Sequence, residues 1–226
     1  MGVAKYSIRG TDYIGAYSNA CDSYAIVGVG LAEKVKSFLF KFLKVRIINF
    51  SSNGSDMAGI YARGNSNGVV VSNITREREL AALKAQFHNG ENICLLKSNV
   101  NAVGNNILAN DKIALVNPEY EASSVKEIRN ALGVETLRME TGRFKTVGAN
   151  NILTNKGIAV NNRSTDEELE EIEKLTGFKP VMTTANTGGL GIGLGTISNS
   201  NGLLTGYSTT GFELTRLMDA LNIEDD

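Results

Sequence analysis

The strongest constraint on the fold of this chain is a pattern that recurs five times along it. The stretch VGNNILANDKIALV at 103–116 reappears, with substitutions, as VGANNILTNKGIAV at 147–160. Each copy begins at a glycine that follows an apolar residue, and we call these the anchor glycines: Gly15, Gly59, Gly104, Gly148 and Gly193. Successive anchor glycines are 44 or 45 residues apart. Self-similarity at such a period is typical of a repeat architecture, in which each copy forms one small structural unit.

Within each unit the sequence predicts a β-hairpin opened by the anchor glycine, then a helix, then a further strand. Turn-forming pairs separate two apolar runs and favour hairpins because their residues tolerate positive φ; examples are Asn67-Gly68, Asn110-Asp111 and Asn201-Gly202. Apolar residues at helical spacing then predict five helices, at 35–42, 80–87, 125–132, 169–175 and 214–221. β-like runs follow the first four helices, at 45–50, 92–96, 134–139 and 180–184.

Capping boxes predict where three of these helices begin. In this motif a Ser or Thr and a Glu three residues later exchange hydrogen bonds with the backbone of the first turn. The candidate pairs are Ser124 with Glu127, Ser164 with Glu167, and Thr210 with Glu213. We therefore expect the third, fourth and fifth helices to begin at these residues.

The fifth unit lacks a final strand, and the N-terminal segment can supply one. The β-like run at 3–8 precedes the first anchor glycine. We expect it to pair with the fifth unit, close a ring and remove exposed sheet edges. The prediction is one α/β domain over 1–226, a five-bladed propeller with units at about 9–52, 53–98, 99–142, 143–187 and 188–226. Units of this size have too little core to fold alone, so their stability must come from their neighbours.

The anchor glycines have two interpretations. If five equivalent strands converge on the axis of a ring, residues without a Cβ allow their backbones to approach closely there. Alternatively, they are ordinary turn glycines with no shared contact.

Composition and charge argue against several classes of function. The chain has 23 basic and 24 acidic side chains, whereas domains bound to nucleic acid by bulk charge usually have a clear basic excess. Cys21 and Cys94 cannot form a disulfide framework, and we expect no metal site. The stretch TGGLGIGLG at 187–195 contains no G-x-G-x-x-G pattern, so we expect no nucleotide cofactor. No apolar run has the length of a signal peptide or a membrane span, and we expect a cytoplasmic protein.

The other reactive or charged residues have structural interpretations. His88, the only histidine, follows the second helix, where it can interact with free carbonyls and the helix dipole. Cys94 lies in an apolar run, and Cys21 lies in a hairpin turn with no histidine nearby in sequence to activate it. Five basic residues in and after the first helix form a solvated face, with a contact to RNA or an acidic partner as the alternative: Lys34, Lys36, Lys41, Lys44 and Arg46.

Several motifs resemble the translation initiation factor 6 family, the ribosome anti-association factors of archaea and eukaryotes. They are NGVVVSNITREREL (67–80), NAVGNNILANDKIALVNPE (101–119), VGANNILTNKGIAV (147–160), TANTG (184–188) and STTGFEL (208–214). The resemblance spans essentially the whole chain, and the long C-terminal extension of eukaryotic members is absent, as in archaeal forms. It implies the pentein fold, a five-bladed α/β propeller with pseudo-fivefold symmetry, in agreement with the five units.

The resemblance also implies a binding function without chemistry. Family members bind the large ribosomal subunit on the face that meets the small subunit, and so block joining. Their release involves an elongation-factor-like GTPase and the Shwachman–Bodian–Diamond syndrome protein. They approach the subunit with the anchor-glycine end, which implies contact by Gly15, Gly104 and Asn105; Ile60 stands where eukaryotic members carry arginine. We expect a monomer that needs no cofactor.

An enzyme is the alternative, because pentein rings also house guanidino-group hydrolases and transferases. Those enzymes use a cysteine nucleophile near the C-terminal end, faced by a histidine and acidic residues. Here no cysteine follows Cys94, and only His88 could act as the base. We therefore expect no enzymatic activity.

Overall fold

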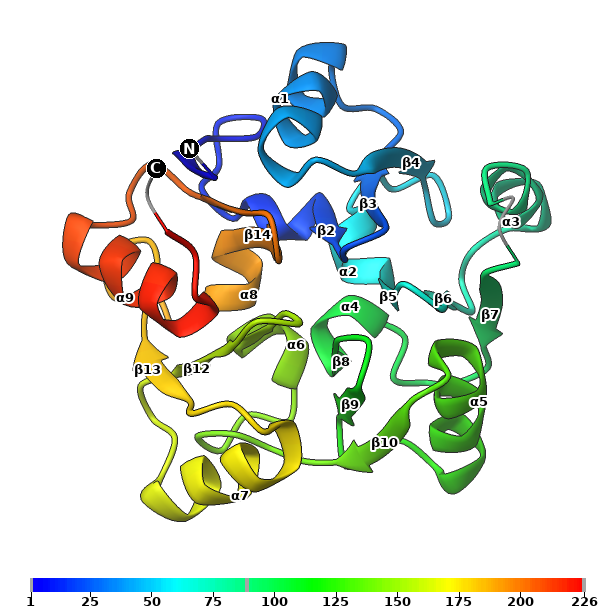
Figure 1. The fold of residues 1–226 in the computed structure, drawn as a ribbon. Coiled ribbons are helices and arrows are strands. Elements are labelled where there is room, and N and C mark those ends of the chain that lie inside the picture. The colour runs from blue at the N-terminus through cyan, green and yellow to red at the C-terminus, as the bar shows by residue number, and fades with distance from the viewer. Residues whose placement is uncertain (1, 88–89, 225–226) are drawn as a thin grey trace.

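A computed structural model describes residues 2–87 and 90–224 and places five α/β units around a common centre (Figure 1). In these residues the strands form five three-stranded sheets. The long helices lie at the periphery, and short helical turns lie nearest the centre (Figure 1). The architecture is therefore a mixed α/β, pentein-like fold with pseudo-fivefold symmetry.

The first four units contain the same elements in the same order, and the fifth contains all of them except the final strand. Each opens with a short helical turn: η1 (Ile14–Ala16), α2 (Ala58–Tyr61), α4 (Val103–Asn106), α6 (Val147–Asn150) and α8 (Ile192–Gly195). The first strands are β2 (Ser18–Ala20), β5 (Ala62–Asn65), β8 (Ile107–Ala109), β11 (Ile152–Leu153) and β14 (Thr196–Asn199). The second strands are β3 (Tyr24–Gly28), β6 (Gly68–Ser72), β9 (Ile113–Val116), β12 (Ile158–Asn161) and β15 (Gly202–Thr205). The long helices are α1 (Glu33–Leu43), α3 (Glu77–Lys84), α5 (Ala122–Leu132), α7 (Asp166–Thr176) and α9 (Gly211–Leu221). The third strands of the first four units are β4 (Arg46–Phe50), β7 (Asn92–Leu96), β10 (Glu135–Arg138) and β13 (Val181–Thr183).

The second strand is the middle strand of each sheet. In the first unit β2 and β3 are antiparallel, with Ser18 opposite Val27, and β4 runs parallel to β3, with Tyr24 opposite Arg46. Every residue of the five middle strands is buried. This burial explains why these strands have continuous apolar runs instead of alternating apolar and polar residues.

The N-terminal segment supplies the third strand of the fifth sheet. Strand β1 (Val3–Lys5) runs parallel to β15, with Val3 opposite Leu203 and Lys5 opposite Thr205. It is shorter than the expected run at 3–8, although the Tyr6 amide still donates to the Thr205 carbonyl at 2.8 Å. The strand order β14-β15-β1 therefore matches the order found in the other four sheets.

The hydrophobic core is divided among the junctions between successive units. Among the described residues there are five buried clusters, and each combines side chains from two neighbouring units. Tyr24 of the first unit, for example, packs with Leu83 of the second. Val27 of the first unit packs in the same way with Ile197 of the fifth. Each unit thus buries its apolar surface against its neighbours, as expected for units of this size.

A hairpin follows each anchor glycine, as predicted, but the segments that converge at the centre are helical turns and not strands. The anchor glycines lie in helical turns of three or four residues, and these turns meet at the centre (Figure 1). The hairpin strands begin after each turn. Four residues are too few to show helical periodicity in a sequence, so hydrophobic spacing could not reveal these turns.

Only one of the three predicted capping boxes forms as expected. Thr210 and Glu213 begin α9, whereas α7 is capped by Thr165 and Glu168, one residue after the predicted pair. Helix α5 begins two residues before Ser124, which is buried inside the helix and cannot act as its cap. Ser124 is 3% exposed, and this burial outweighs its local capping preference.

The predicted hairpins form, but their turn-forming pairs do not adopt positive φ, which was the reason for predicting them. Neither Asn67 nor Gly68 has a positive φ. Instead, the Asn65 side-chain oxygen accepts hydrogen bonds from both of these amides, at 3.0 and 3.2 Å. Gly68 is required because an added Cβ would lie less than 3.0 Å from the Ala131 carbonyl, in the last turn of α5.

Candidate functional site

The five anchor glycines meet at the centre of the molecule. A Cβ added to any one would lie less than 3.0 Å from the carbonyl oxygen of another: Gly59 against Gly15, Gly104 against Gly59, Gly148 against Gly104, Gly193 against Gly148, and Gly15 against Gly193. None of the five has a positive φ. Glycine is therefore needed here for the close approach of backbones, not for an unusual backbone conformation.

The surface at these turns, which we call the anchor face, consists of the residues that flank the anchor glycines. The residues two positions before the glycines are Tyr13, Met57, Ala102, Thr146 and Gly191. All five have nearly the same backbone conformation, with φ between −83° and −78° and ψ between 59° and 67°. The residues just after the glycines are Ala16, Ile60, Asn105, Ala149 and Leu194. One repeated backbone thus presents five different sets of side chains.

The anchor face exposes apolar side chains on its first two units. Tyr13 is 50% exposed and Met57 is 38% exposed. Ile60 and Asn105, both singled out from the sequence, are half-buried in the neighbouring turns. Exposed apolar residues on a backbone fixed by close packing are suited to contact with another macromolecule.

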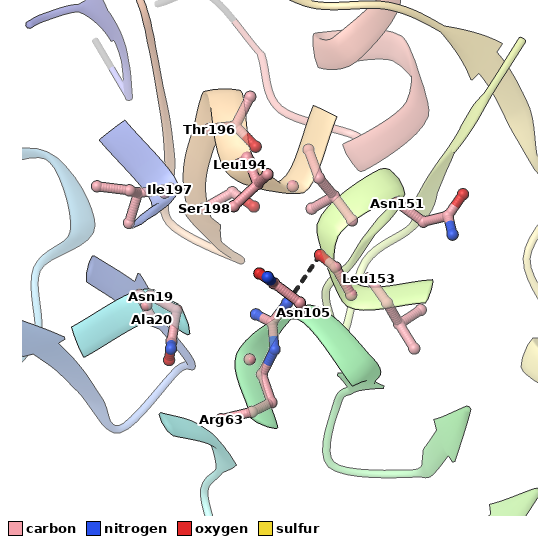
Figure 2. A pocket seen from close by; sticks show the side chains of 16 residues that line it. Asn19, Ala20, Arg63, Asn105, Asn151, Leu153, Leu194, Thr196, Ile197 and Ser198 are labelled. Carbon is pink, nitrogen blue, oxygen red and sulfur yellow. Dashed lines mark hydrogen bonds between the residues drawn. The ribbon is translucent and has the colours of Figure 1, made fainter. Parts of the chain in front are cut away.

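A cavity of about 20 Å³ is lined by all five anchor glycines at the centre of the molecule. Arg63, from β5, extends into it, and Asn105 and Ser198 also line it (Figure 2). The Arg63 Nε donates to the Ile107 carbonyl at 3.0 Å, and an Nη donates to the Gly148 carbonyl at 3.3 Å. The side chain therefore connects the second, third and fourth units. Burial lowers the pKa of the Arg63 guanidinium to about 10, so it remains charged at neutral pH.

Sequence reasoning missed Arg63, although a signal was present. It stands four residues after its anchor glycine, where three other units have Leu108, Ile152 and Ile197. Two of these side chains are almost fully buried, and the third is 7% exposed. An arginine at a position that is apolar in three of the other four units should have been recognised as an inward-facing charge.

The opposite end of the axis is closed by a polar network among the hairpin loops. The Asn155 side-chain amide donates to Asp22 at 2.8 Å and to Asp111 at 2.6 Å. Ser200 donates to Asp22 through its amide and its hydroxyl, each at 2.7 Å, and Ser66 donates to Asp111 at 2.7 and 2.8 Å. These bonds satisfy both carboxylates and tie together loops from all five units.

The two cysteines are protonated thiols at neutral pH. Burial raises the pKa of the Cys21 thiol to about 12 and that of Cys94 to about 11. A nucleophilic cysteine needs the thiolate, which requires a lowered pKa. His88, the candidate base of the enzyme interpretation, lies outside the described residues. Within the described ranges, no three His, Cys, Asp or Glu side chains are grouped so that they could hold a metal ion.

The basic residues of the first unit divide into two groups. Lys34, Lys41 and Lys44 are exposed at α1 and its end, whereas Lys36 is half-buried and pairs with Glu33 at 2.7 Å. Arg46 instead pairs with Glu91 and lies over the rings of Tyr24 and Phe87, at 5.9 and 5.3 Å from their centroids. The solvated basic face is therefore smaller than the sequence suggests.

Comparison with known proteins gives one consistent result. The chain matches the family model described as the eIF-6 family over residues 3–220. It is 36% identical to translation initiation factor 6 of Saccharolobus islandicus over 222 residues, which cover 98% of this chain and 99% of that protein. It is 35% identical to the factor of the same name from Thermoplasma acidophilum over 223 residues, covering 97% and 100% of the two chains. The corresponding factor of Thermococcus onnurineus is 34% identical over 228 residues, with full coverage of both.

In the part of the chain that the structure describes, none of the helices combines the length and the apolar character needed to cross a membrane.

Proposed function

This chain belongs to the eIF-6 family, and we propose that it binds the large ribosomal subunit and prevents the small subunit from joining. The observation that carries the proposal is the similarity to proteins named translation initiation factor 6 along almost the entire chain. Steric occlusion requires no chemistry. It needs only a rigid body, a specific surface and slow dissociation from the subunit.

We propose the anchor face as the surface that contacts the subunit. Gly15 and Gly104 form the packed backbone beneath it, and Asn105 and Ile60 are side chains that a partner can reach. The exposed Tyr13 and Met57 add apolar area on the same face. A stable protein–protein contact buries roughly 1,600 Å² in total, and a few central side chains carry most of its energy.

A purely binding role agrees with the chemistry of the central cavity. Among the described residues that line it there is neither a cysteine nor a carboxylate. The raised pKa values of Cys21 and Cys94 argue against a thiolate nucleophile elsewhere. We therefore propose a monomer that acts in the cytoplasm without enzymatic activity. Its release would depend on a GTPase and the Shwachman–Bodian–Diamond syndrome protein, as in the family.

Co-sedimentation with purified ribosomal subunits tests the proposal. The protein should sediment with large subunits and lower the yield of joined ribosomes when small subunits are added. Sedimentation with small subunits alone, or with neither subunit, would contradict it. Release of urea or ammonia from arginine or agmatine, abolished by Cys94→Ala, would support the enzyme alternative instead.

Two asparagine variants test whether the anchor face is the contact surface. Asn105→Lys introduces a longer, charged side chain on this face, and it should weaken binding by about ten-fold or more, equivalent to about 1.4 kcal/mol. Asn92→Lys is the matched control, because exposed Asn92 lies opposite Gly68 at the hairpin-loop end. Both variants should still unfold cooperatively on heating, which would show that the fold is intact. Equal binding by the two variants would show that the anchor face is not the contact surface.

A further inference from the structure

We propose that the central cavity is an anion site, in which one chloride ion binds against the guanidinium group of Arg63. The proposal concerns a ligand of the folded chain itself and does not depend on the ribosomal role.

The charge on Arg63 has no counter-charge in the described structure. Arg63 is absent from the ion pairs formed by the described residues, and it is the only charged side chain among those that line the cavity. Arg63 is half-buried, and burial lowers its pKa with no neighbouring acid to offset the effect, so this partial removal of the charge from water has a cost. An anion beside the guanidinium would offset this cost.

The hydrogen bonds of Arg63 leave most of its donors available. A guanidinium has five N–H donors. One on Nε and one on an Nη group bind the Ile107 and Gly148 carbonyls. The remaining donors have no acceptor among the described protein groups.

The cavity wall supplies further donors. The side-chain amide of Asn105 and the hydroxyl of Ser198 both line the cavity, and neither forms a hydrogen bond with another described residue. Figure 2 shows the Asn105 amide beside the guanidinium of Arg63. Together these groups offer N–H and O–H donors from the second, third and fifth units to a single central ligand.

The charge of Arg63 is not needed for its structural bond. Asn19 occupies the equivalent position of the first unit, and its amide donates to the Ala62 carbonyl of the next unit. This bond is equivalent to the one from Arg63 Nε to Ile107. A neutral side chain can therefore connect two units at this position, and the positive charge requires a further explanation.

The size of the cavity selects the ligand. About 20 Å³ is enough for a water molecule or a monatomic ion of similar size, since one water requires roughly 10–15 Å³ on this measure. Phosphate, sulfate and gluconate are too large. The adjacent guanidinium disfavours cations. A small monovalent anion, with chloride as the abundant example, fits both the volume and the charge.

Stability in chloride tests the site. An ion that binds only the folded protein raises the folded-to-unfolded ratio by the factor 1 + [ion]/Kd, about eleven-fold at ten times the Kd. At constant ionic strength, the urea and thermal midpoints of the full chain should therefore rise when chloride replaces gluconate. Equal midpoints in the two salts would overturn the proposal.

Two arginine variants test whether the stabilisation by chloride arises in the central cavity. Arg63→Met removes the charge and should remove the difference between chloride and gluconate. Arg78→Met is the control, because Arg78 is exposed on α3, and it should preserve that difference. A chloride effect that persists in Arg63→Met would place the ion elsewhere and contradict the assignment.

Bromide provides a test that does not depend on the folding of Arg63→Met. Crystals of the parent protein soaked in bromide should give an anomalous peak in the central cavity, within contact distance of the Arg63 guanidinium. A data set with bromide peaks only on the outer surface, and none in the cavity, would overturn the proposal.

Discussion

At the scale of single residues, the anchor glycines show how strongly one missing atom can constrain a fold. Their backbones are so close that a methyl group would overlap a carbonyl oxygen of the adjacent turn. Such an overlap cannot be relieved by a side-chain rotation, because both partners are backbone. The whole turn would have to move, and the turns on either side would move with it.

Gly104→Ala should therefore destabilise the protein severely. We expect a loss of about 3 kcal/mol or more, since the added Cβ overpacks a backbone contact with Gly59. Gly211→Ala is the control, because no atom lies within 4 Å of its Cβ position and its φ is not positive. It should be neutral or slightly stabilising. Urea unfolding would measure both, and equal losses in the two variants would refute the packing explanation.

Glu213 shows how a buried carboxylate can stabilise a junction. It is 5% exposed and accepts hydrogen bonds from the Gly188 amide, the Thr184 hydroxyl, and both the amide and the hydroxyl of Thr210. Burial alone would raise the pKa of Glu213, but these hydrogen bonds outweigh it and lower the pKa to about 2. The carboxylate is therefore more acidic in the folded than in the unfolded chain.

Glu213→Gln should make the acid unfolding of the protein less steep. Because the folded pKa lies below the ordinary value of 4.5, the stabilisation is fully present above that value and is lost as the pH falls toward 2. We expect a contribution of about 2–3 kcal/mol at neutral pH. Urea unfolding between pH 7 and pH 2 would measure it, with Glu170→Gln, an exposed position on α7, as the control. If both variants retained the pH dependence of the parent, the hydrogen bonds to Glu213 would not be its source.

At the scale of elements, polar side chains in the hairpin loops connect one unit to the next. The amide of Asn110 donates to the Thr154 carbonyl of the following unit at 2.9 Å, and its oxygen accepts from the Lys112 and Ile113 amides. Asn65 and Asn199 form equivalent bonds to Asn110 and Cys21. The same side chain thus shapes its own loop and binds the neighbouring unit.

Asn110→Ala should cost about 2–3 kcal/mol, because it leaves buried backbone groups of two units without partners. The change should lower the urea midpoint while the m-value stays constant. The control is Asn162→Ala, an exposed asparagine after β12. A midpoint unchanged from the parent would mean that water replaces the lost bonds.

The sequence predicted the elements whose patterns are long enough to be periodic. The long helices and the third strands lie close to their predicted ranges, and β7 matches its range at both ends. The central turns were missed because four residues show no periodicity, and the cap of α5 was misplaced because burial of Ser124 outweighs its local preference. The contacts of Arg63 with Ile107 and Gly148 could not be predicted, since they depend on how three units are placed in space.

At the scale of the whole molecule, the stability of the fold depends on the junctions between units. Each of the five buried clusters among the described residues combines two units, so losing one junction exposes apolar surface on both sides. The junction between the fifth and first units differs from the others in its connection. Strand β1 belongs to the sheet of the fifth unit, and the chain continues from it into the first unit.

Circular permutation can measure what this shared strand contributes. The original ends can be joined by a short flexible linker, because Val3 and Ile223 pack in the same cluster. One permutant begins at Lys179, between α7 and β13, so that β13 becomes an N-terminal strand shared between units as β1 is in the parent. The other begins at Asn99, an exposed position between two complete units, and no strand is shared across its gap.

The permutant that begins at Lys179 should be nearly as stable as the parent, whereas the one that begins at Asn99 should be less stable by about 2–4 kcal/mol. In the folded Lys179 permutant the pairing of β13 with β12 at three register positions still joins the two sides of the gap, at about 1 kcal/mol net for each hydrogen bond, whereas no strand pairing crosses the gap at Asn99. Urea unfolding of the three proteins gives the comparison. Equal stability of the two permutants would mean that the buried clusters alone hold the junctions, and that the position of the N-terminal strand adds nothing to the stability of the fold.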